Sequence, residues 1–179
     1  MSSRQSKKAT VKEIAVFGML GALMYVSKMI MEFLPNIHLI GVFIVASTVV
    51  YRKKALYPIY IFVFLTGLLN GFGTWWIPYL YIWAVLWAVV MLLPKNMNWK
   101  KATVVYAITC GLHGIFYGVL YAPFQAIVYN LDFKGTLTWI ATGLPFDAIH
   151  GLGNLIAGAI MIMPVIELLK GAEKFSKNR

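Results

Sequence analysis

Charged residues and cysteine are scarce in this chain. Only 12% of its 179 residues are charged and one is cysteine, whereas 60% are hydrophobic. A soluble domain carries about 25% charged residues and about 45–50% apolar ones. One soluble core of this size cannot bury such an excess, so the composition favours an integral membrane protein without a soluble catalytic domain. The single Cys110 excludes an internal disulfide. There is no CxxC pair and no zinc-ligand spacing, and we expect no metal site.

Motifs that carry common hydrolytic chemistry are also missing. The sequence contains no HExxH, no GxSxG and no P-loop GxxxxGK followed by Ser or Thr. Without a P-loop the protein cannot hydrolyse ATP itself, so an energised importer would need separate ATPase subunits. We therefore expect a protein that is not an enzyme and carries no cofactor.

Basic residues are present in strongly clustered form: fourteen of the sixteen Lys and Arg residues fall in four groups separated by apolar stretches. Cytoplasmic loops of membrane proteins are enriched in Lys and Arg. With all four groups inside, the chain crosses the membrane six times and both termini are cytoplasmic. We attribute the net charge of +10 to contacts with anionic lipid and expect no nucleic-acid partner, because no basic stripe follows a helix. The groups are Arg4/Lys7/Lys8/Lys12, Arg52/Lys53/Lys54, Lys95/Lys100/Lys101 and Lys170/Lys174/Lys177/Arg179.

The hydrophobic pattern predicts one all-α membrane domain over residues 1–179, a bundle of six transmembrane helices behind a basic cytoplasmic tail at 1–13. We take the basic and then apolar start as a retained first helix rather than a signal peptide. The second helix is short: its 14 residues rise about 21 Å against a hydrocarbon core of about 30 Å, so it packs inside the bundle or thins the bilayer. The predicted helices cover about 14–34, 38–51, 55–69, 76–93, 102–121 and 145–169.

Two of these boundaries depend on proline. The first helix is expected to end at Pro35-Asn36. The sixth is expected to begin at Pro145, a residue suited to a first turn, after a short polar lead-in at 136–143. The fifth helix ends near residue 121 or continues past Pro123 to residue 129.

Polar side chains within the predicted helices lie at one depth, in the outer half. A charged side chain at the bilayer centre costs about 2.5–3.5 kcal/mol on insertion scales, so polar groups there need partners or water. Two sets repeat at helical spacing and share a face, one on the fifth helix and one on the sixth. Asn36 and His38 lie at the outer exit of the first helix. The candidate ligand-binding residues are Lys28, Glu32, Asn70, Trp75, Trp76, Tyr79, His113, Tyr117, Tyr121, Gln125, Asp147, His150 and Asn154.

These residues predict a pocket that opens outward and is closed from below. A channel would need a polar lining along its whole length, whereas the cytoplasmic halves of the helices are almost wholly apolar. Aromatic walls suit a ligand with a flat or apolar body and a few hydrogen-bonding groups. Trp83 and Trp87 are expected in lipid or in the core.

Several candidates also have a structural explanation. The three aromatic residues at 75–79 fit an interfacial belt. Lys28 and Glu32, four residues apart, fit a self-neutralising pair. Asp147 and His150 fit a cap for the start of the sixth helix, and His113 fits a satisfied core histidine.

Small residues recur at the spacing that allows close helix contact, as in Gly18-x-x-x-Ala22 of the first helix. They serve packing within the bundle or docking to another membrane subunit, for which the first helix is the best candidate.

Two segments resemble a known family: residues 15–24 read AVFGMLGALM, and residues 144–154 read LPFDAIHGLGN. Together with six short spans, a basic tail and both termini inside, they resemble the substrate-binding S component of energy-coupling factor (ECF) vitamin importers. The resemblance in layout covers nearly the whole chain.

This resemblance implies capture of a water-soluble vitamin at the outer ends of the fourth to sixth helices, in the plasma membrane of a bacterium. It also implies docking to a transmembrane coupling subunit with two cytosolic ATPase subunits. The family docks through an Ala-x-x-x-Ala surface of the first helix, matched here by Gly18 and Ala22, with Ala15 one turn before. The aromatic residues favour a pyrimidine, a thiamine-like, pyridoxine-like or flavin-like compound, or a corrinoid.

Three alternatives remain at this point. One is a stand-alone permease for small solutes. Another is an intramembrane enzyme that uses Asp147, His150 and His113, with or without a metal. The third is a membrane scaffold without a ligand.

Overall fold

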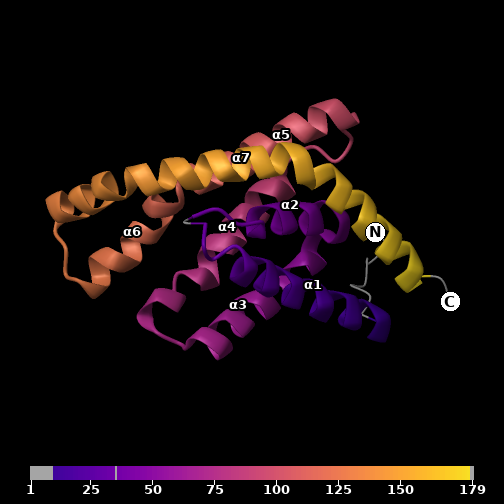
Figure 1. Ribbon diagram of the computed structural model, residues 1–179, viewed down its shortest axis with the longest axis horizontal. Helices are drawn as coiled ribbons and strands as arrows, with labels where there is room; N and C mark the ends of the chain where they lie inside the picture. Colours follow the sequence, from indigo (N-terminus) through magenta and orange to yellow (C-terminus); the bar gives the residue numbers. More distant parts are fainter. Residues whose placement is uncertain (1–9, 35, 178–179) are drawn as a thin grey trace, which may run out of the picture.

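The computed structural model describes residues 10–34 and 36–177, and every regular element in these ranges is helical, as the sequence predicts. Arg4, Lys7, Lys8, Pro35 and Arg179 lie outside the described residues. The elements are α1 (Val11–Ile30), α2 (Ile40–Tyr51), the 3₁₀ helix η1 (Arg52–Ala55), α3 (Leu56–Asn70), the 3₁₀ helix η2 (Thr74–Trp76), α4 (Tyr79–Leu92), α5 (Trp99–Ile115), α6 (Tyr117–Val128) and α7 (Phe133–Lys177) (Figure 1).

Four segments are long and apolar enough to cross a membrane: Val11–Ile30, Thr74–Leu92, Trp99–Val128 and Phe133–Phe175. They indicate a membrane protein. The helices α2 and α3 contain 12 and 15 residues. They rise about 18 and about 22 Å, which is short of a hydrocarbon core of about 30 Å. The six crossings therefore stay a prediction.

Large apolar side chains are exposed on the outside of the long helices. Examples are Met19 on α1, Leu92 on α4, Ile127 on α6 and Ile160 on α7, which are between 64% and 86% exposed. Soluble monomers rarely expose contiguous apolar patches beyond a few hundred Å². This surface is the kind that lipid covers.

The first helix begins earlier and ends earlier than predicted. Thr10 and Glu13 form a reciprocal capping box, with the Glu13 N–H donating to Thr10 Oγ1 at 3.2 Å. The helix ends at Ile30, and residues 31–34 form a turn. Proline disfavours helical geometry in the residue before it, so Pro35 favours an end of the helix ahead of residue 34. Glu32 therefore lies beyond the helix.

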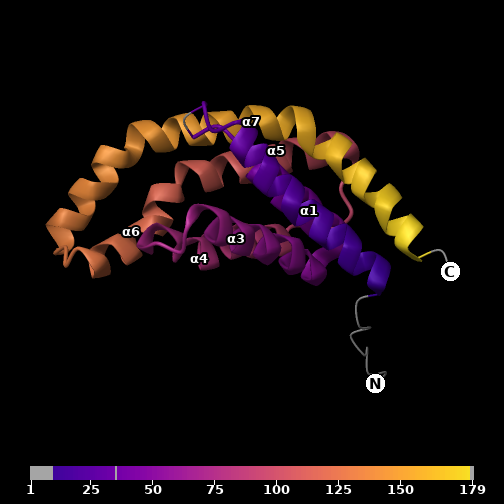
Figure 2. The same cartoon turned by 60° about the horizontal axis from the view of Figure 1, so that its bottom comes forward.

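The last helix is far longer than predicted. Residues 136–143, expected as a separate lead-in, belong to α7, and Pro145 lies within that helix rather than at its start. The polar residues of the lead-in are satisfied inside the helix, because the hydroxyls of Thr136 and Thr138 donate to Asp132 and Lys134 carbonyls at 2.9 Å. Proline bends such a helix without ending it, and α7 arches over the other helices in Figure 2.

The predicted fifth helix is divided into two. Its first part, α5, begins at Trp99, where the side chain of Asn98 accepts a hydrogen bond from the Lys101 N–H at 2.9 Å. The chain leaves the α5 geometry at Phe116 and continues as α6 to Val128. The longer of the two predicted ends is therefore correct.

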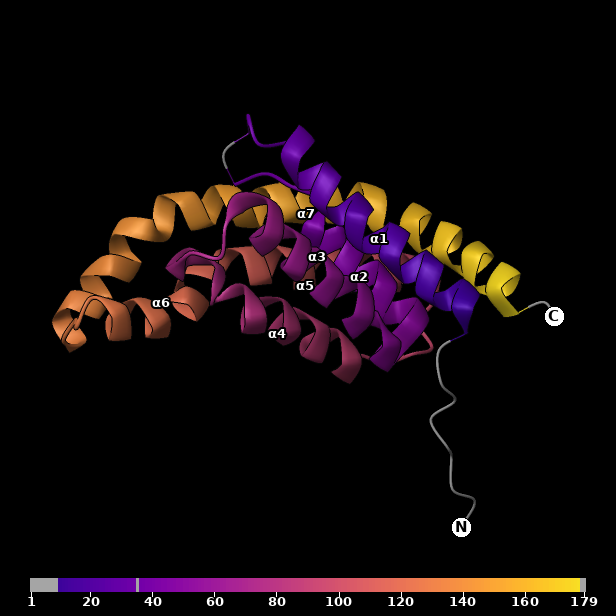
Figure 3. The same ribbon diagram turned by 90° about the horizontal axis from the view of Figure 1, so that it is seen from below.

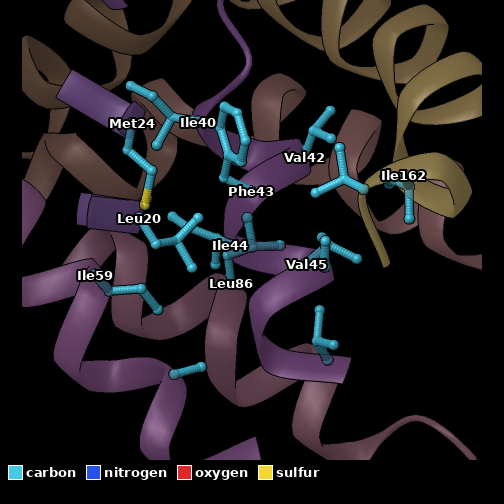
Figure 4. Packing of buried hydrophobic residues seen from close by; sticks show 14 of the residues in the cluster. Leu20, Met24, Ile40, Val42, Phe43, Ile44, Val45, Ile59, Leu86 and Ile162 are labelled. Carbon is cyan, nitrogen blue, oxygen red and sulfur yellow. The ribbon is translucent and has the colours of Figure 1, made fainter. Parts of the chain in front are cut away.

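The short α2 lies in the centre of the bundle, in contact with α1, α4, α5 and α7 (Figure 3). All residues from 40 to 48 are buried. Of the two predicted alternatives, packing inside the bundle is the one observed. Figure 4 shows the apolar core around α2, to which Leu20 and Met24 of α1, Ile59 of α3, Leu86 of α4 and Ile162 of α7 contribute.

Basic residues from distant parts of the sequence gather at one end of the bundle. Lys54 of η1 forms an ion pair of 2.7 Å with the carboxylate at the start of α1. The Arg52 guanidinium donates to the Met91 carbonyl at the end of α4 at 2.8 Å. Lys12 lies 4.9 Å above the ring of Phe175 near the end of α7. We call this the basic end.

Candidate functional site

A cavity of about 190 Å³ lies away from the basic end, where α1 finishes and α2, α4 and α6 begin. The helices α1, α2 and α4 each run from this cavity to the basic end. Among the described residues, the cavity is lined by Lys28, Met31, Glu32, Leu34, Asn36, Ile37, His38, Tyr79, Tyr117 and His150. Five of the thirteen predicted ligand-binding residues are in this lining.

Five rings from five segments form a cluster that we call the histidine–tryptophan cluster, and three of them, His38, Tyr117 and His150, line the cavity. It comprises His38 before α2, Trp83 of α4, His113 of α5, Tyr117 of α6 and His150 of α7. The rings of His38 and His150 are 4.8 Å apart between centroids, and Tyr117 lies 5.0 Å from His150. The Trp83 ring lies 5.7 Å from His113 and 5.8 Å from Tyr117. Helix packing therefore brings together residues that the sequence separates widely.

Unpaired polar atoms are concentrated in and beside this cluster. Six buried side-chain nitrogen or oxygen atoms within the described residues have no hydrogen-bond partner in the protein. All six belong to His38, Trp83, His113, His150 or Asn154. Buried polar atoms are normally paired with protein, water or ligand, and leaving one unpaired costs about 1–3 kcal/mol. Their gathering at one place marks a site with the capacity to bind a polar molecule.

Two of these unpaired atoms have a defined role as hydrogen-bond donor or acceptor. The His113 Nε2 lies 3.1 Å from the Ile82 carbonyl. Because a carbonyl only accepts, Nε2 carries the proton, and Nδ1 of the neutral ring is an acceptor. The Trp83 Nε1 can only donate. The cluster thus offers one buried acceptor and one buried donor on neighbouring rings.

The opposite charges of Lys28 and Glu32 remain separate at the rim of the cavity. The described residues contain no ion pair between them. Their spacing is also compatible with a self-neutralising ion pair on one helix face. Glu32 lies in the turn after α1, however, so the two residues do not have the i, i+4 geometry of a helix. Both charges line the cavity.

Asp147 lies outside the cavity lining and stabilises the backbone of another helix. Its two carboxylate oxygens lie 3.2 and 3.1 Å from the Gly118 N–H, in the first turn of α6. A side chain at position 118 would collide with this carboxylate. A carboxylate at a helix N-terminus is favoured by the helix dipole. Asp147 therefore caps α6, not the helix that contains it.

The aromatic residues after α3 connect the chain segments beside the cavity. The Trp76 indole donates to the Val63 carbonyl at 2.7 Å, and the Tyr121 hydroxyl donates to the Trp75 carbonyl at 2.8 Å. The Tyr121 ring also stacks on Trp139, with 6.1 Å between centroids. These contacts give Trp75, Trp76 and Tyr121 positions beside the cavity, but not in its described lining.

Asn70 and Gln125 are likewise outside the described lining. The Asn70 side chain accepts a hydrogen bond of 3.0 Å from the Tyr25 hydroxyl, which joins the ends of α1 and α3. Asn154, one turn along α7 from His150, packs against Gly41 of α2. Its amide is buried, and both polar atoms are unpaired.

The predicted site set omitted His38 and Trp83. A signal for Trp83 was available, because it follows Tyr79 by four residues and shares its helix face. Its side chain is 1% exposed and packs 5.5 Å from Tyr79, so the core alternative for Trp83 is correct. His38 is predicted at the exit of the first helix, but no sequence pattern indicates a partner on α7.

The predicted docking residues Ala15, Gly18 and Ala22 occupy the outside of α1. A side-chain carbon added at Gly18 would meet no atom within 4 Å. Ala22 lines an apolar groove of about 520 Å³ between α1 and α7. By contrast, a side chain at Gly21 would lie 2.5 Å from Ile61 of α3. The α1–α3 contact therefore uses Gly21 and leaves Gly18 open.

The described residues contain no group of three or more His, Cys, Asp and Glu side chains placed to hold a metal ion. Comparison with protein-family models, with curated proteins and with solved structures gives no match. The residues of the site itself are therefore the basis for any proposal about the function of this chain.

Proposed function

We propose that this chain is the substrate-binding S component of an ECF-type importer, which captures a water-soluble vitamin or a related micronutrient from outside. The observation that carries the proposal is the cavity with its unpaired buried polar atoms. A ligand with hydrogen-bonding groups would satisfy the two unpaired atoms in the cavity lining, on His38 and His150, and the surrounding rings would contact its flat faces. The ATP-driven step belongs to partner subunits, since the chain has no P-loop.

The distribution of charge supports the proposed orientation. Lys12 of α1 and Arg52 and Lys54 of η1 lie at the end of the bundle away from the cavity. If the basic end is cytoplasmic, the cavity faces outward, and both termini are inside a six-span bundle in the plasma membrane. In this arrangement α2 and α3 complete the set of spans, and α2 is shielded from lipid by its neighbours.

The core below the cavity favours a capture protein over a stand-alone permease. A permease needs a polar path from one side to the other. Between the cavity and the basic end, Ile44 of α2 is packed among buried apolar side chains of other helices, including Met24, Ile59 and Leu86. Release to the inside therefore requires the coupling subunit in this proposal, with the open Gly18 face of α1 as its docking surface.

The first experiment is native mass spectrometry of the detergent-purified chain, followed by binding measurements with a panel of vitamins. We expect a small molecule carried through purification, or binding at micromolar concentration or tighter. Co-expression with the coupling subunit and ATPases should make uptake depend on ATP. No binding across the panel, or uptake that survives ATP depletion without partners, would contradict the proposal.

A matched pair of tyrosine variants tests whether the ligand binds in the cavity. Tyr117 lines the cavity, whereas the Tyr81 hydroxyl donates to the Leu120 carbonyl at 2.9 Å, and Tyr81 is outside the described lining. Tyr117→Ala should lower ligand affinity at least about tenfold, which corresponds to about 1.4 kcal/mol. Tyr81→Ala should keep wild-type affinity. Equal losses in both variants would attribute the effect to folding instead.

A further inference from the structure

We infer that the ligand is a single-ring nitrogen heterocycle of pyrimidine or pyridine size, with its ring held between the aromatic walls of the cavity and hydrogen-bonded to His38 and His150. This inference rests on the proposed function and narrows it to one substrate class.

The volume of the cavity sets the size of the ligand. Sites for drug-sized molecules enclose about 300–1,000 Å³, whereas this cavity encloses about 190 Å³. A three-ring flavin or a corrinoid is too large for it. A single substituted ring is not.

The walls determine the shape of the ligand. Tyr79, Tyr117, His38 and His150 line the same cavity from four different segments. The His150 ring meets His38 at an interplanar angle of 73° and Tyr117 at 63°. Aromatic side chains in a cavity lining offer a guest ring both faces and edges, and an aromatic guest gains from contact with either.

The unpaired atoms determine the polarity of that ring. His38 Nδ1 and His150 Nε2 belong to residues of the lining and have no hydrogen-bond partner in the protein. His150 is 4% exposed. A neutral imidazole nitrogen donates or accepts according to its tautomer. A ring with its own nitrogen atoms and amino or hydroxyl substituents can pair with both histidines, whereas a hydrocarbon ring would leave them unpaired.

A second layer of polar atoms continues beneath the two histidines. The Trp83 ring lies 6.0 Å from that of His38 and 5.7 Å from that of His113, and the unpaired atoms of both Trp83 and His113 are buried. This layer offers a donor from Trp83 and an acceptor from His113. Neither residue is in the described lining of the cavity, so this polar layer lies behind the two histidines rather than in contact with the ligand.

The experiment measures binding of the purified full-length chain to pyridoxine, nicotinic acid, an aminopyrimidine alcohol, riboflavin and cobalamin by isothermal titration calorimetry. We expect at least one single-ring compound to bind at micromolar concentration or tighter, and riboflavin and cobalamin to bind at least about a hundredfold more weakly. Tight binding of riboflavin or cobalamin would overturn the size inference and leave the S-component proposal intact. Binding of none of the five would overturn the single-ring inference, whereas the S-component proposal fails only if the broader vitamin panel also gives no binding.

Variants test the role of the histidines. His150→Phe and His38→Phe keep a ring but remove the polar nitrogen atoms, and each should weaken the single-ring ligand about tenfold. Tyr106→Phe is the control: it removes a buried hydroxyl near Arg52 and Lys170 at the basic end and should bind as wild type. Wild-type affinity in both histidine variants would overturn the inference.

A ligand-side comparison covers the case in which a histidine variant fails to fold. The wild-type chain is titrated with the benzene analogue of whichever heterocycle binds, identical except for the ring nitrogen atoms. We expect affinity to fall at least about tenfold, because the histidines then lose their partners. Equal affinity for the two compounds would contradict recognition of a nitrogen heterocycle.

Discussion

The carboxylate of Asp147 on α7 lies 3.1–3.2 Å from the backbone N–H of Gly118 and thereby caps the first turn of α6. The two residues meet where α5 gives way to α6, and a glycine is required because any side chain at position 118 would occupy the space of the carboxylate. Asp147, one of the few acidic residues within the candidate spans, thus has a structural partner. Its role differs from that of the residues that line the cavity.

Removal of this cap should destabilise the protein without a direct effect on the ligand. We expect Asp147→Ala to lower the free energy of unfolding by about 1 kcal/mol, the usual effect of losing a capping side chain. Asp147→Asn should cost less, because the amide oxygen still accepts from Gly118. Thermal unfolding in detergent measures both, with Glu167→Ala as a control in an exposed ion pair. A tenfold loss of affinity in Asp147→Asn at unchanged stability would instead put the carboxylate in the binding site.

Substitutions at two glycines of α1 should affect docking and folding separately. Gly18→Leu adds a side chain where no atom lies within 4 Å, so the chain should fold and bind ligand normally but associate more weakly with the coupling subunit. Gly21→Leu places the side chain against Ile61 and Pro58 of α3 and should destabilise the fold by about 1–3 kcal/mol. Co-purification and thermal unfolding measure the two effects. If Gly18→Leu associates with the coupling subunit as tightly as wild type, the open face of α1 is not the docking surface.

The two charges at the rim should affect the ligand rather than the fold. Neither Lys28 nor Glu32 gives up an ion pair when it is neutralised, so Lys28→Gln and Glu32→Gln should unfold like wild type. A lost hydrogen bond to a charged group is worth about 1.5–3 kcal/mol, roughly ten- to a hundredfold in affinity. We expect the larger loss for Lys28→Gln, because Lys28 is less exposed than Glu32.

Lys54→Gln is the matched control for the rim charges. It breaks the ion pair with the buried Glu13 at the opposite end of α1. It should lower stability and leave ligand affinity unchanged. If both rim variants bind ligand as tightly as wild type, the charges at the rim do not contact it.

Cysteine labelling in intact cells measures the orientation of the chain in the membrane. The native Cys110 is fully buried, so the wild-type chain should give little background. Lys134→Cys, in the proposed outer region, should react with a membrane-impermeant maleimide, and Lys100→Cys at the start of α5 should react only after permeabilisation. The opposite pattern would invert the proposed topology and turn the cavity toward the cytoplasm.

The sequence by itself determined the class of the protein. The share of apolar residues and the small number of charges require an apolar environment for long helices, and the grouping of Lys and Arg follows from the cost of placing charge in lipid. Periodicity placed Tyr117 and His150 on inward faces, because residues four apart on a helix share a side. These properties depend on local composition and spacing, which are visible without a fold.

The tertiary structure alone decided which polar residues meet. Asp147 and His150 are three residues apart on α7, yet one caps α6 and the other lines the cavity. His38 joins the site only because the buried α2 brings the start of that helix against α7. Such contacts depend on helix packing and on whether a helix ends at a proline or continues through it, as α7 does at Pro145, and a one-dimensional pattern contains neither.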